Sequence, residues 1–128
     1  MLHVKTIVAP SNIHGLGLFA DQFIPKGTTI WNFTEGFDQK FNPEQIVAFP
    51  QILQDFFSTY SSISKKTGKN ILCGDQGNYI NHSKDPNINC KYIEGEEEFI
   101  AYALRDIEAG EEITENYSEY DNSKEIIK

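Results

Sequence analysis

The stretch from residue 78 to residue 87 is Asn78-Tyr79-Ile80-Asn81-His82-Ser83-Lys84-Asp85-Pro86-Asn87. Polar side chains follow the pair Tyr79-Ile80 in direct succession. In one interpretation they form an Asx-type turn that satisfies its own backbone. In the other they form a recognition corner, because Asn offers both a donor and an acceptor and His offers two ring nitrogens. A hydrolase that pairs His82 with Cys73 or Ser83 is disfavoured, since no third orienting group or elbow motif accompanies them.

Toward the N-terminus lies a glycine-bearing segment, Gly15-Leu16-Gly17. It lacks the third glycine and the strand-to-helix setting of a dinucleotide fingerprint, so a Rossmann site is not predicted. Taken alone, it is more typical of a glycine bulge where two segments cross closely. The alternating stretch 3–8 before it predicts a strand that breaks at Pro10. A Pro-Gly turn at 24–28 precedes a further expected strand.

The region 42–61 is the one that predicts helix. Asn42 is a suitable N-cap, Pro43 suits the first helical position, and Gln45 stands where a capping box requires it. Apolar residues then recur at a one-face helical spacing, at Ile46, Phe49, Leu53, Phe56, Phe57 and Tyr60. Pro50 interrupts this pattern and should kink or split the helix. The rest of the chain predicts short strands joined by turns, so the expected fold class is mainly β with one helical insert.

The C-terminal part predicts two more strands. Residues 98–104 have the pattern of a half-buried strand, and residues 111–117 leave a turn and end on Tyr117. By itself this tyrosine is most often an amphipathic rim residue. The acidic clusters 96–98 and 111–112 lack a loop of spaced oxygen ligands, so no metal site is predicted.

Length and composition limit the classes of protein further. The chain has 128 residues, 39% of them hydrophobic, which predicts a single domain over 1–128. Without a long apolar run or a basic start that leads into one, neither a membrane span nor a signal peptide is expected. Two cysteines, Cys73 and Cys90, are too few for a disulfide framework and favour an intracellular, reducing location.

The net charge is −8, from 11 Lys and Arg against 19 Asp and Glu. Such a charge disfavours direct binding to nucleic acid. It favours a cationic partner such as a lysine-rich peptide, or it serves only to keep the protein soluble.

Four segments, in their order along the chain, together resemble the SET-domain lysine methyltransferases. They are 15–20, 24–30, 78–87 and 107–117. The third is very similar to the family's R-F-I-N-H-S-C-x-P-N, and the fourth to its I-x-x-G-E-E-L-T-x-D-Y. The match covers His3 to Tyr120. It implies a β-clip fold, in which small curved β-sheets surround a knot-like C-terminal crossing and the helical insert falls near 42–61.

The resemblance implies transfer of a methyl group from S-adenosylmethionine to a lysine of a basic protein or histone-like tail. In the family the cofactor lies beside the crossing, and the lysine enters from the opposite face through a narrow channel. The implied cofactor-binding residues are Gly15, Leu16, Gly17, Asn81, His82 and Tyr117. Tyr117 is also the implied catalytic residue, with its hydroxyl directed at the methyl group and the nitrogen. The implied substrate channel comprises Phe33, Tyr79, Glu115 and Tyr120.

The sequence departs from the family pattern in this channel. Phe33 and Thr34 stand near the family's Y-x-G, and Glu115 occupies a position where the family usually has an aromatic residue. A carboxylate there either favours a lysine ammonium or raises the pKa of the lysine and slows the reaction. Two alternative classes therefore stay open: a SET-like module that binds cofactor or protein without turnover, and a structural domain that binds no cofactor.

No cysteine follows Cys90, so the sequence lacks the zinc-binding tail of many nuclear family members. The segment through Tyr120, or a second subunit in a homodimer, would then have to close the site. The missing zinc segments fit a stand-alone protein, located in the cytoplasm or, if host chromatin is the target, in the nucleus.

Overall fold

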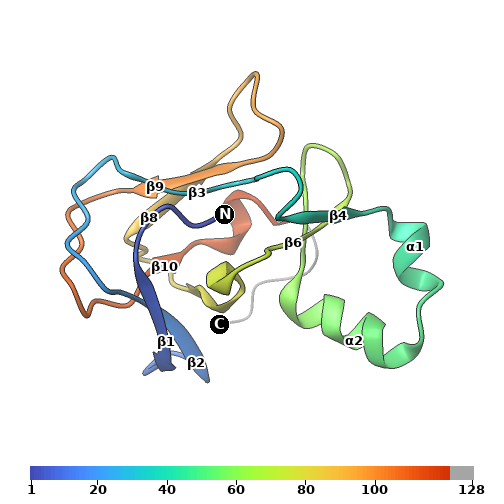
Figure 1. Cartoon of the computed structure of the whole chain (residues 1–128), viewed down its shortest axis with the longest axis horizontal. Coiled ribbons are helices and arrows are strands. Elements are labelled where there is room, and N and C mark those ends of the chain that lie inside the picture. The colour runs from blue at the N-terminus through green and yellow to red at the C-terminus, as the bar shows by residue number, and fades with distance from the viewer. Residues whose placement is uncertain (122–128) are drawn as a thin grey trace.

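The computed structural model describes residues 1–121 (Figure 1). Its elements follow in the order β1 (Thr6–Pro10), β2 (Leu16–Ala20), β3 (Thr29–Asn32), β4 (Gln39–Phe41), α1 (Pro43–Val47), α2 (Gln51–Tyr60), β5 (Ser62–Ile63), β6 (Asn70–Leu72), the 3₁₀ helix η1 (Gln76–Tyr79), β7 (Asn81–His82), β8 (Ile88–Lys91), β9 (Ile100–Ala103), β10 (Thr114–Glu115) and the 3₁₀ helix η2 (Tyr117–Glu119). The expected mainly β fold with one helical region is confirmed.

The strands form four small sheets in place of one large sheet. Two have three strands each, ordered β3-β9-β8 and β4-β6-β5, and two are the pairs β1-β2 and β7-β10. The first strand lies later than the alternating pattern predicted, because its antiparallel pairing with β2 runs from Thr6 opposite Ala20 to Pro10 opposite Leu16. Pro10 is the last paired residue of β1, whereas the sequence predicted that the strand would stop before it. An edge position tolerates proline, since no further strand needs its missing N–H.

The helical region splits where the sequence predicted. Pro50 precedes α2 with an extended backbone conformation, so α1 and α2 are separate helices. At the start of α1 the Asn42 N–H donates to Oε1 of Gln45 at 2.7 Å, which satisfies one free backbone donor. Both helices lie at one end of the molecule, beside β4 and away from β1 and β2 (Figure 1).

The apolar face of these helices is covered less than its spacing predicts. Phe57 is buried, and its ring packs edge-on against Phe41 of β4 at 4.9 Å and stacks with Phe49 at 5.7 Å. Leu53 and Phe56, on the same predicted face, are 40% and 41% exposed. The short sheet β4-β6-β5 is too narrow to cover the whole face. None of the helices within residues 1–121 has the length and apolar character needed to cross a membrane.

The main core lies among the sheets and not beneath the helices. Its fully buried aliphatic side chains are Leu18, Ile24, Ile30, Ile88, Ile107 and Ile113. Trp31 of β3 stacks on Phe99 at 4.8 Å, at the side of the core that faces β10 and η2. Burial of side chains of this size contributes about 1.5–3 kcal/mol each, so these residues dominate the stability of the fold.

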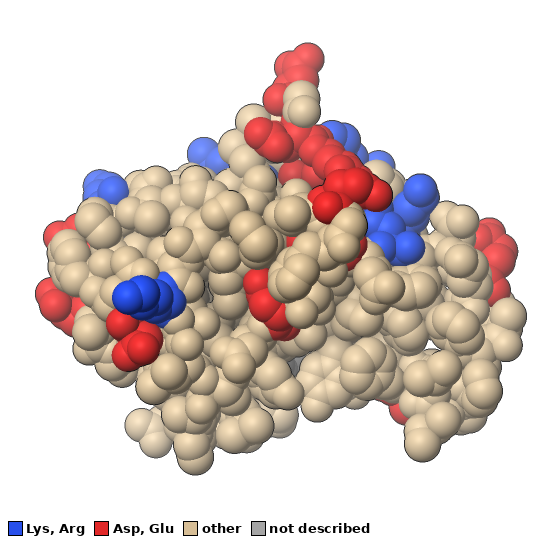
Figure 2. Space-filling view, viewed as in Figure 1, with Lys and Arg blue, Asp and Glu red and all other residues tan. Residues whose placement is uncertain are grey.

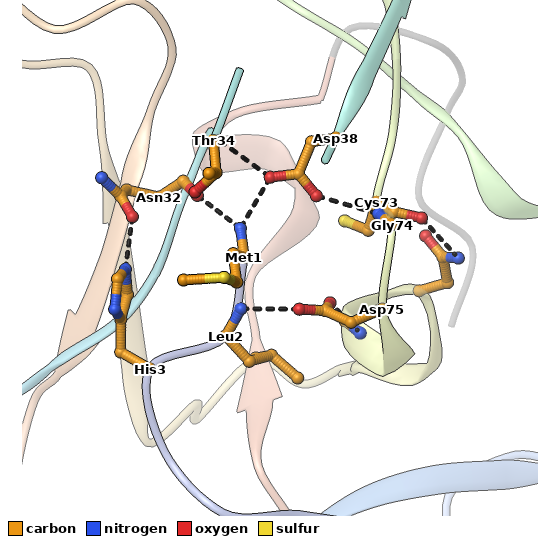
Figure 3. Close-up of polar contacts among 11 residues, drawn as sticks. Met1, Leu2, His3, Asn32, Thr34, Asp38, Cys73, Gly74 and Asp75 are labelled. Carbon is orange, nitrogen blue, oxygen red and sulfur yellow. Dashed lines mark hydrogen bonds and ion pairs between the residues drawn. The ribbon is translucent and has the colours of Figure 1, made fainter. Parts of the chain in front are cut away.

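Asp38 joins segments that are distant in sequence (Figure 3). Its Oδ2 accepts a hydrogen bond from the Thr34 N–H at 2.8 Å and pairs with the Met1 ammonium at 2.7 Å. Its Oδ1 accepts from the Gly74 N–H at 2.9 Å. Gly74 must be glycine here, because an added Cβ would lie 2.3 Å from the carbonyl oxygen of Phe37. The carboxylate thus fastens the chain before β4 to the chain that leads into η1.

Candidate functional site

The two strongest sequence motifs meet at a two-residue parallel pair. β7 and β10 pair with Asn81 opposite Thr114 and His82 opposite Glu115. The pairing extends past the strands, because the Ser83 N–H donates to the Glu115 carbonyl at 2.9 Å. The Tyr117 N–H donates to Nδ1 of His82 at 3.1 Å. The contacts fix the start of η2, and with it Tyr117, against the 81–83 segment.

Asn81 holds the glycine-bearing segment against this pair. Its Nδ2 lies 3.1 Å from the carbonyl oxygens of His14 and Leu16, and 3.0 Å from Oε2 of Glu112. The Asx-turn interpretation is therefore wrong for Asn81, whose side chain bonds to residues far away in sequence. The local turn is made instead by Ser83, whose Oγ accepts from the Asp85 N–H at 3.1 Å.

The two glycines of this segment serve different purposes. Gly15 has φ +47°, a left-handed conformation that most residues avoid. At Gly17 an added Cβ would lie 2.4 Å from Oε2 of Glu112, so a side chain there would displace this carboxylate. The close approach of Glu112 therefore explains the glycine at position 17 through packing within the protein, without a bound cofactor.

A cavity of about 490 Å³ lies beside Asn81. Its lining residues are His14, Gly15, Leu16, Ser58, Thr59, Tyr60, Asn78, Tyr79, Asn81 and Tyr117. Of the predicted cofactor-binding residues, the structure brings Gly15, Leu16, Asn81 and Tyr117 together on this wall. Gly17 and His82 do not line it, because Gly17 faces Glu112 and the buried His82 ring accepts from the Tyr117 backbone.

A second, narrower cavity of about 90 Å³ is also lined by Tyr117. Residues that line it include Trp31, Cys73, Asn78, Ile80, Phe99, Ala101, Glu115, Tyr117 and Tyr120. The two cavities share Tyr117 and Asn78, together with Thr59 and Tyr60 from the end of α2. Tyr117 therefore stands where a group in the larger cavity would meet a group in the narrower one.

The four predicted channel residues do not line one common cavity. Glu115 and Tyr120 line the narrow cavity, and Tyr79 lines the larger one. Phe33 lines neither cavity, and its ring lies 4.7 Å from the Lys40 ammonium instead. The narrow cavity is walled by Trp31, which stands two positions earlier and points into the core from β3.

Sequence reasoning missed several lining residues. Trp31 and Asn78 stand within predicted segments, but no spacing signal marks them as cavity residues. Thr59 and Tyr60 belong to the helical insert, whose position relative to the site depends on the tertiary fold. Of these residues, only Tyr60 was marked by the sequence pattern, because it is the last residue of the apolar helix face that the spacing predicted.

The Tyr117 hydroxyl donates to the carbonyl oxygen of Ile80 at 2.8 Å. Burial, reinforced by the nearby carboxyls of Glu115 and Asp121, raises the pKa of the Tyr117 phenol well above its ordinary value. The phenol therefore stays protonated at neutral pH. It can orient a neighbouring group by hydrogen bonding, but it is a poor proton acceptor.

Glu115 is the buried carboxyl of the narrow cavity. The Tyr120 hydroxyl donates to its Oε1, and the Cys90 thiol lies 3.5 Å from its Oε2. Burial raises the pKa of Glu115 to about 8, against the lowering effect of those two donors. At neutral pH the group is therefore close to its titration range.

Two buried polar atoms of the same cavity have no hydrogen-bond partner among the described residues. They are Nε1 of Trp31, a donor, and Oδ1 of Asn78, an acceptor. An unsatisfied buried polar group costs about 1–3 kcal/mol, so both atoms favour a polar occupant of the cavity. Within residues 1–121 no group of three or more His, Cys, Asp or Glu side chains is arranged to hold a metal ion.

The comparisons with known proteins identify a family for this chain. The profile of the SET domain family matches residues 15–118. A Plasmodium falciparum protein whose name assigns it as histone-lysine N-methyltransferase 1 is 26% identical over 123 residues, which is 90% of this chain. This chain spans only 2% of the length of that relative.

Two solved structures show the same fold. A crystal structure of a Plasmodium falciparum protein, assigned by name as a histone methyltransferase, has a TM-score of 0.62 at 25% identity and covers 91% of this chain and 95% of its own. A chain of the Chaetomium thermophilum Polycomb Repressive Complex 2, bound to S-adenosylmethionine, has a TM-score of 0.69 at 24% identity and covers 94% of this chain and 16% of its own. From the family match over most of its length, the chain belongs to the SET domain family.

Proposed function

We propose that the chain is an S-adenosylmethionine-dependent protein-lysine N-methyltransferase. The observation that carries this proposal is the meeting of two cavities at Tyr117, one of about 490 Å³ and one of about 90 Å³. Methyl transfer needs a donor and an acceptor that approach each other in line from opposite sides, and this arrangement supplies a place for each. Membership of the SET domain family supports the same assignment.

The larger cavity suits the cofactor in size and in position. Its volume falls in the range typical of small-molecule sites, about 300–1,000 Å³. The segment at Gly15 and Leu16 brings backbone groups to its wall, and Asn81 holds this segment in place. Bound there, S-adenosylmethionine would supply an electrophilic methyl group at the Tyr117 end of the cavity.

The chain's own residues would then act by positioning. The narrow cavity would hold the end of the lysine side chain between the aromatic walls of Trp31 and Tyr120 and exclude water from it. Tyr117, kept protonated, would orient the reacting nitrogen by a hydrogen bond. Alignment of this kind removes much of the entropic part of the barrier and needs no covalent intermediate.

A second candidate function is a SET-like binding module without turnover. It is favoured by one observation, that the Tyr117 hydroxyl donates to the Ile80 carbonyl in this structure. If this bond persists with substrate present, the Tyr117 hydroxyl cannot donate a hydrogen bond to a group in the cavity. The two candidates differ in whether methyl transfer follows cofactor binding.

A basic protein or peptide, including a histone-like tail, is the substrate class that the charge favours. Figure 2 shows acidic side chains gathered over the loop between β8 and β9, where Glu94, Glu96 and Glu97 are exposed. With a net charge of −8, the protein would attract a lysine-rich segment over a distance of about a Debye length. Such a substrate implies an intracellular location, in the cytoplasm or in the nucleus.

The test is isothermal titration with S-adenosylmethionine, followed by mass spectrometry of mixed basic proteins incubated with protein and cofactor. The expected result is saturable binding and a mass increase of one methyl group on a lysine. Binding without any methylated product would favour the non-catalytic module. A protein that binds neither S-adenosylmethionine nor S-adenosylhomocysteine would contradict both candidates.

A further inference from the structure

No cationic side chain among residues 1–121 forms an ion pair with Glu115, although a buried carboxylate ordinarily has such a partner. The Glu115 side chain is enclosed, with 6% of the residue exposed. The ion pairs of residues 1–121 use Asp38, Glu97, Glu98 and Glu111, and none includes Glu115. Burial of an unpaired charge is costly, so this carboxyl needs either a proton or a cation brought from outside.

The surroundings of Glu115 reinforce that need. Groups that titrate or carry charge face it from every element packed around it: Cys73 from the β6–η1 connection, Cys90 from β8, Tyr117 and Glu119 from η2, and Tyr120 and Asp121 after η2. None of these groups is cationic, and two are carboxyls. The electrostatic potential at Glu115 therefore favours binding of a positive group.

The narrow cavity gives such a group access to Glu115. Its volume of about 90 Å³ is several times the roughly 10–15 Å³ that one water molecule needs, so the end of an aminoalkyl chain can enter it. Asn78, whose side-chain carbonyl has no hydrogen-bond partner among the described residues, also lines this cavity. A primary ammonium carries three donors and no acceptor, so it would satisfy this carbonyl and the carboxylate together.

We propose that Glu115 accepts the proton of the substrate ammonium, and that the Asn78 side-chain carbonyl is the second acceptor that orients it. This inference rests on the proposed methyltransferase function. One proton moves from the lysine ammonium to the carboxylate, which leaves a neutral amine and a carboxylic acid. The amine lone pair then forms the new N–C bond, the C–S bond breaks, and its electron pair stays on sulfur. The products are the ammonium of an N-methylated lysine, S-adenosylhomocysteine and Glu115 as a carboxylic acid, which then releases its proton to solvent.

The assignment predicts a distinctive pH profile. The carboxylate form of Glu115 is required, and its pKa is raised to about 8, so kcat/KM should rise up to about pH 8 and then level off. In Glu115→Gln the lysine ammonium must lose its proton to solvent. The rate should then be lower and keep rising toward the ordinary lysine pKa of about 10.4. Tyr120→Phe removes a donor to the carboxylate, so its plateau should move to higher pH.

A binding test separates this assignment from the function on which it rests. The probes are n-butylammonium, which mimics the end of a lysine, and n-butanol, which is neutral. NMR titration of the whole protein with saturating S-adenosylhomocysteine measures their affinities. Glu115→Gln should weaken n-butylammonium binding by at least tenfold and leave n-butanol binding unchanged. Glu108→Gln, at an exposed carboxyl in a turn, is the control for the same change of charge.

The outcomes distinguish the two claims. Ammonium binding that depends on Glu115, without methyl transfer to any basic protein, would support the site assignment and contradict the proposed enzyme. Methyl transfer by Glu115→Gln with a wild-type rate and pH profile would overturn the assignment and leave the enzyme intact. Equal binding of n-butylammonium to wild type and Glu115→Gln, or no binding to either, would also overturn it.

Discussion

At the scale of single residues, Tyr117 combines a fixed backbone with a protonated side chain. Its N–H is held by His82 and its hydroxyl by the Ile80 carbonyl, at the junction of the two cavities. Because hydrogen bonds fix both its backbone and its hydroxyl, Tyr117 would lose little conformational entropy on orienting a substrate. This makes the hydroxyl, and not the ring, the group whose removal tests the role of the residue.

Removal of that hydroxyl in Tyr117→Phe should lower methyl transfer by roughly a hundredfold, the loss typical of one well-placed donor. Cofactor affinity should stay largely unchanged, because the ring still lines the larger cavity. Stability should fall by about 1 kcal/mol, since the Ile80 carbonyl loses its partner. Single-turnover kinetics, titration with S-adenosylhomocysteine and denaturant unfolding measure the three effects. Tyr102→Phe, on β9, is the matched control, and unchanged turnover in Tyr117→Phe would remove the residue from catalysis.

At the scale of elements, the sequence predicted which segments form strands or helices better than it predicted where those elements begin and end. The motif around Asn81 and the segment that ends at Tyr117 were recognisable because their polar residues have fixed spacing, although the strand expected over 111–117 forms only at Thr114–Glu115. The first strand was predicted too early, since its register is set by pairing with β2 and not by its own alternation. The narrow cavity could not be predicted, because Trp31 and Asn78 reach it only through contacts between sheets.

The contact between β2 and the turn before β10 yields a prediction of its own. Gly17→Ala should destabilise the fold by about 1–3 kcal/mol, because the new methyl group overlaps the Glu112 carboxylate. Denaturant unfolding measures this cost. The same substitution in a Glu112→Ala background should cost about 1 kcal/mol less, since the overlapping atoms are gone. Equal costs in the two backgrounds would show that Glu112 is not what requires glycine.

At the scale of the whole molecule, buried polar side chains help to hold the four small sheets together. Asp38 is one of these, with its side chain fully enclosed. It bonds to the backbone of Thr34 and Gly74, which lie on either side of the helical insert. Composition and pattern predicted the sheets and the insert, but long-range fastening by one carboxylate has no local signature in the sequence.

Asp38→Asn should therefore lower the free energy of unfolding by about 2–4 kcal/mol, because an amide replaces one acceptor oxygen and the ion pair with the Met1 ammonium is lost. Thermal unfolding followed by circular dichroism gives the shift in Tm. Asp21→Asn, at an exposed position with no bonded side chain, should leave Tm unchanged. A Tm for Asp38→Asn within error of wild type would contradict the fastening role.

The pairing of β7 with β10 has a consequence for synthesis of the protein. It joins residues 81–82 to residues 114–115, so the position of Glu115 in the narrow cavity depends on a contact of high sequence separation. Contacts of this kind form late, since the loop between them must close first. During synthesis, a chain that has reached β9 but not β10 contains the glycine-bearing segment and lacks Glu115, Tyr117 and Tyr120 of the narrow cavity. A fragment that stops before β10 would therefore have the wall of the larger cavity formed by Gly15 and Leu16, but no complete narrow cavity.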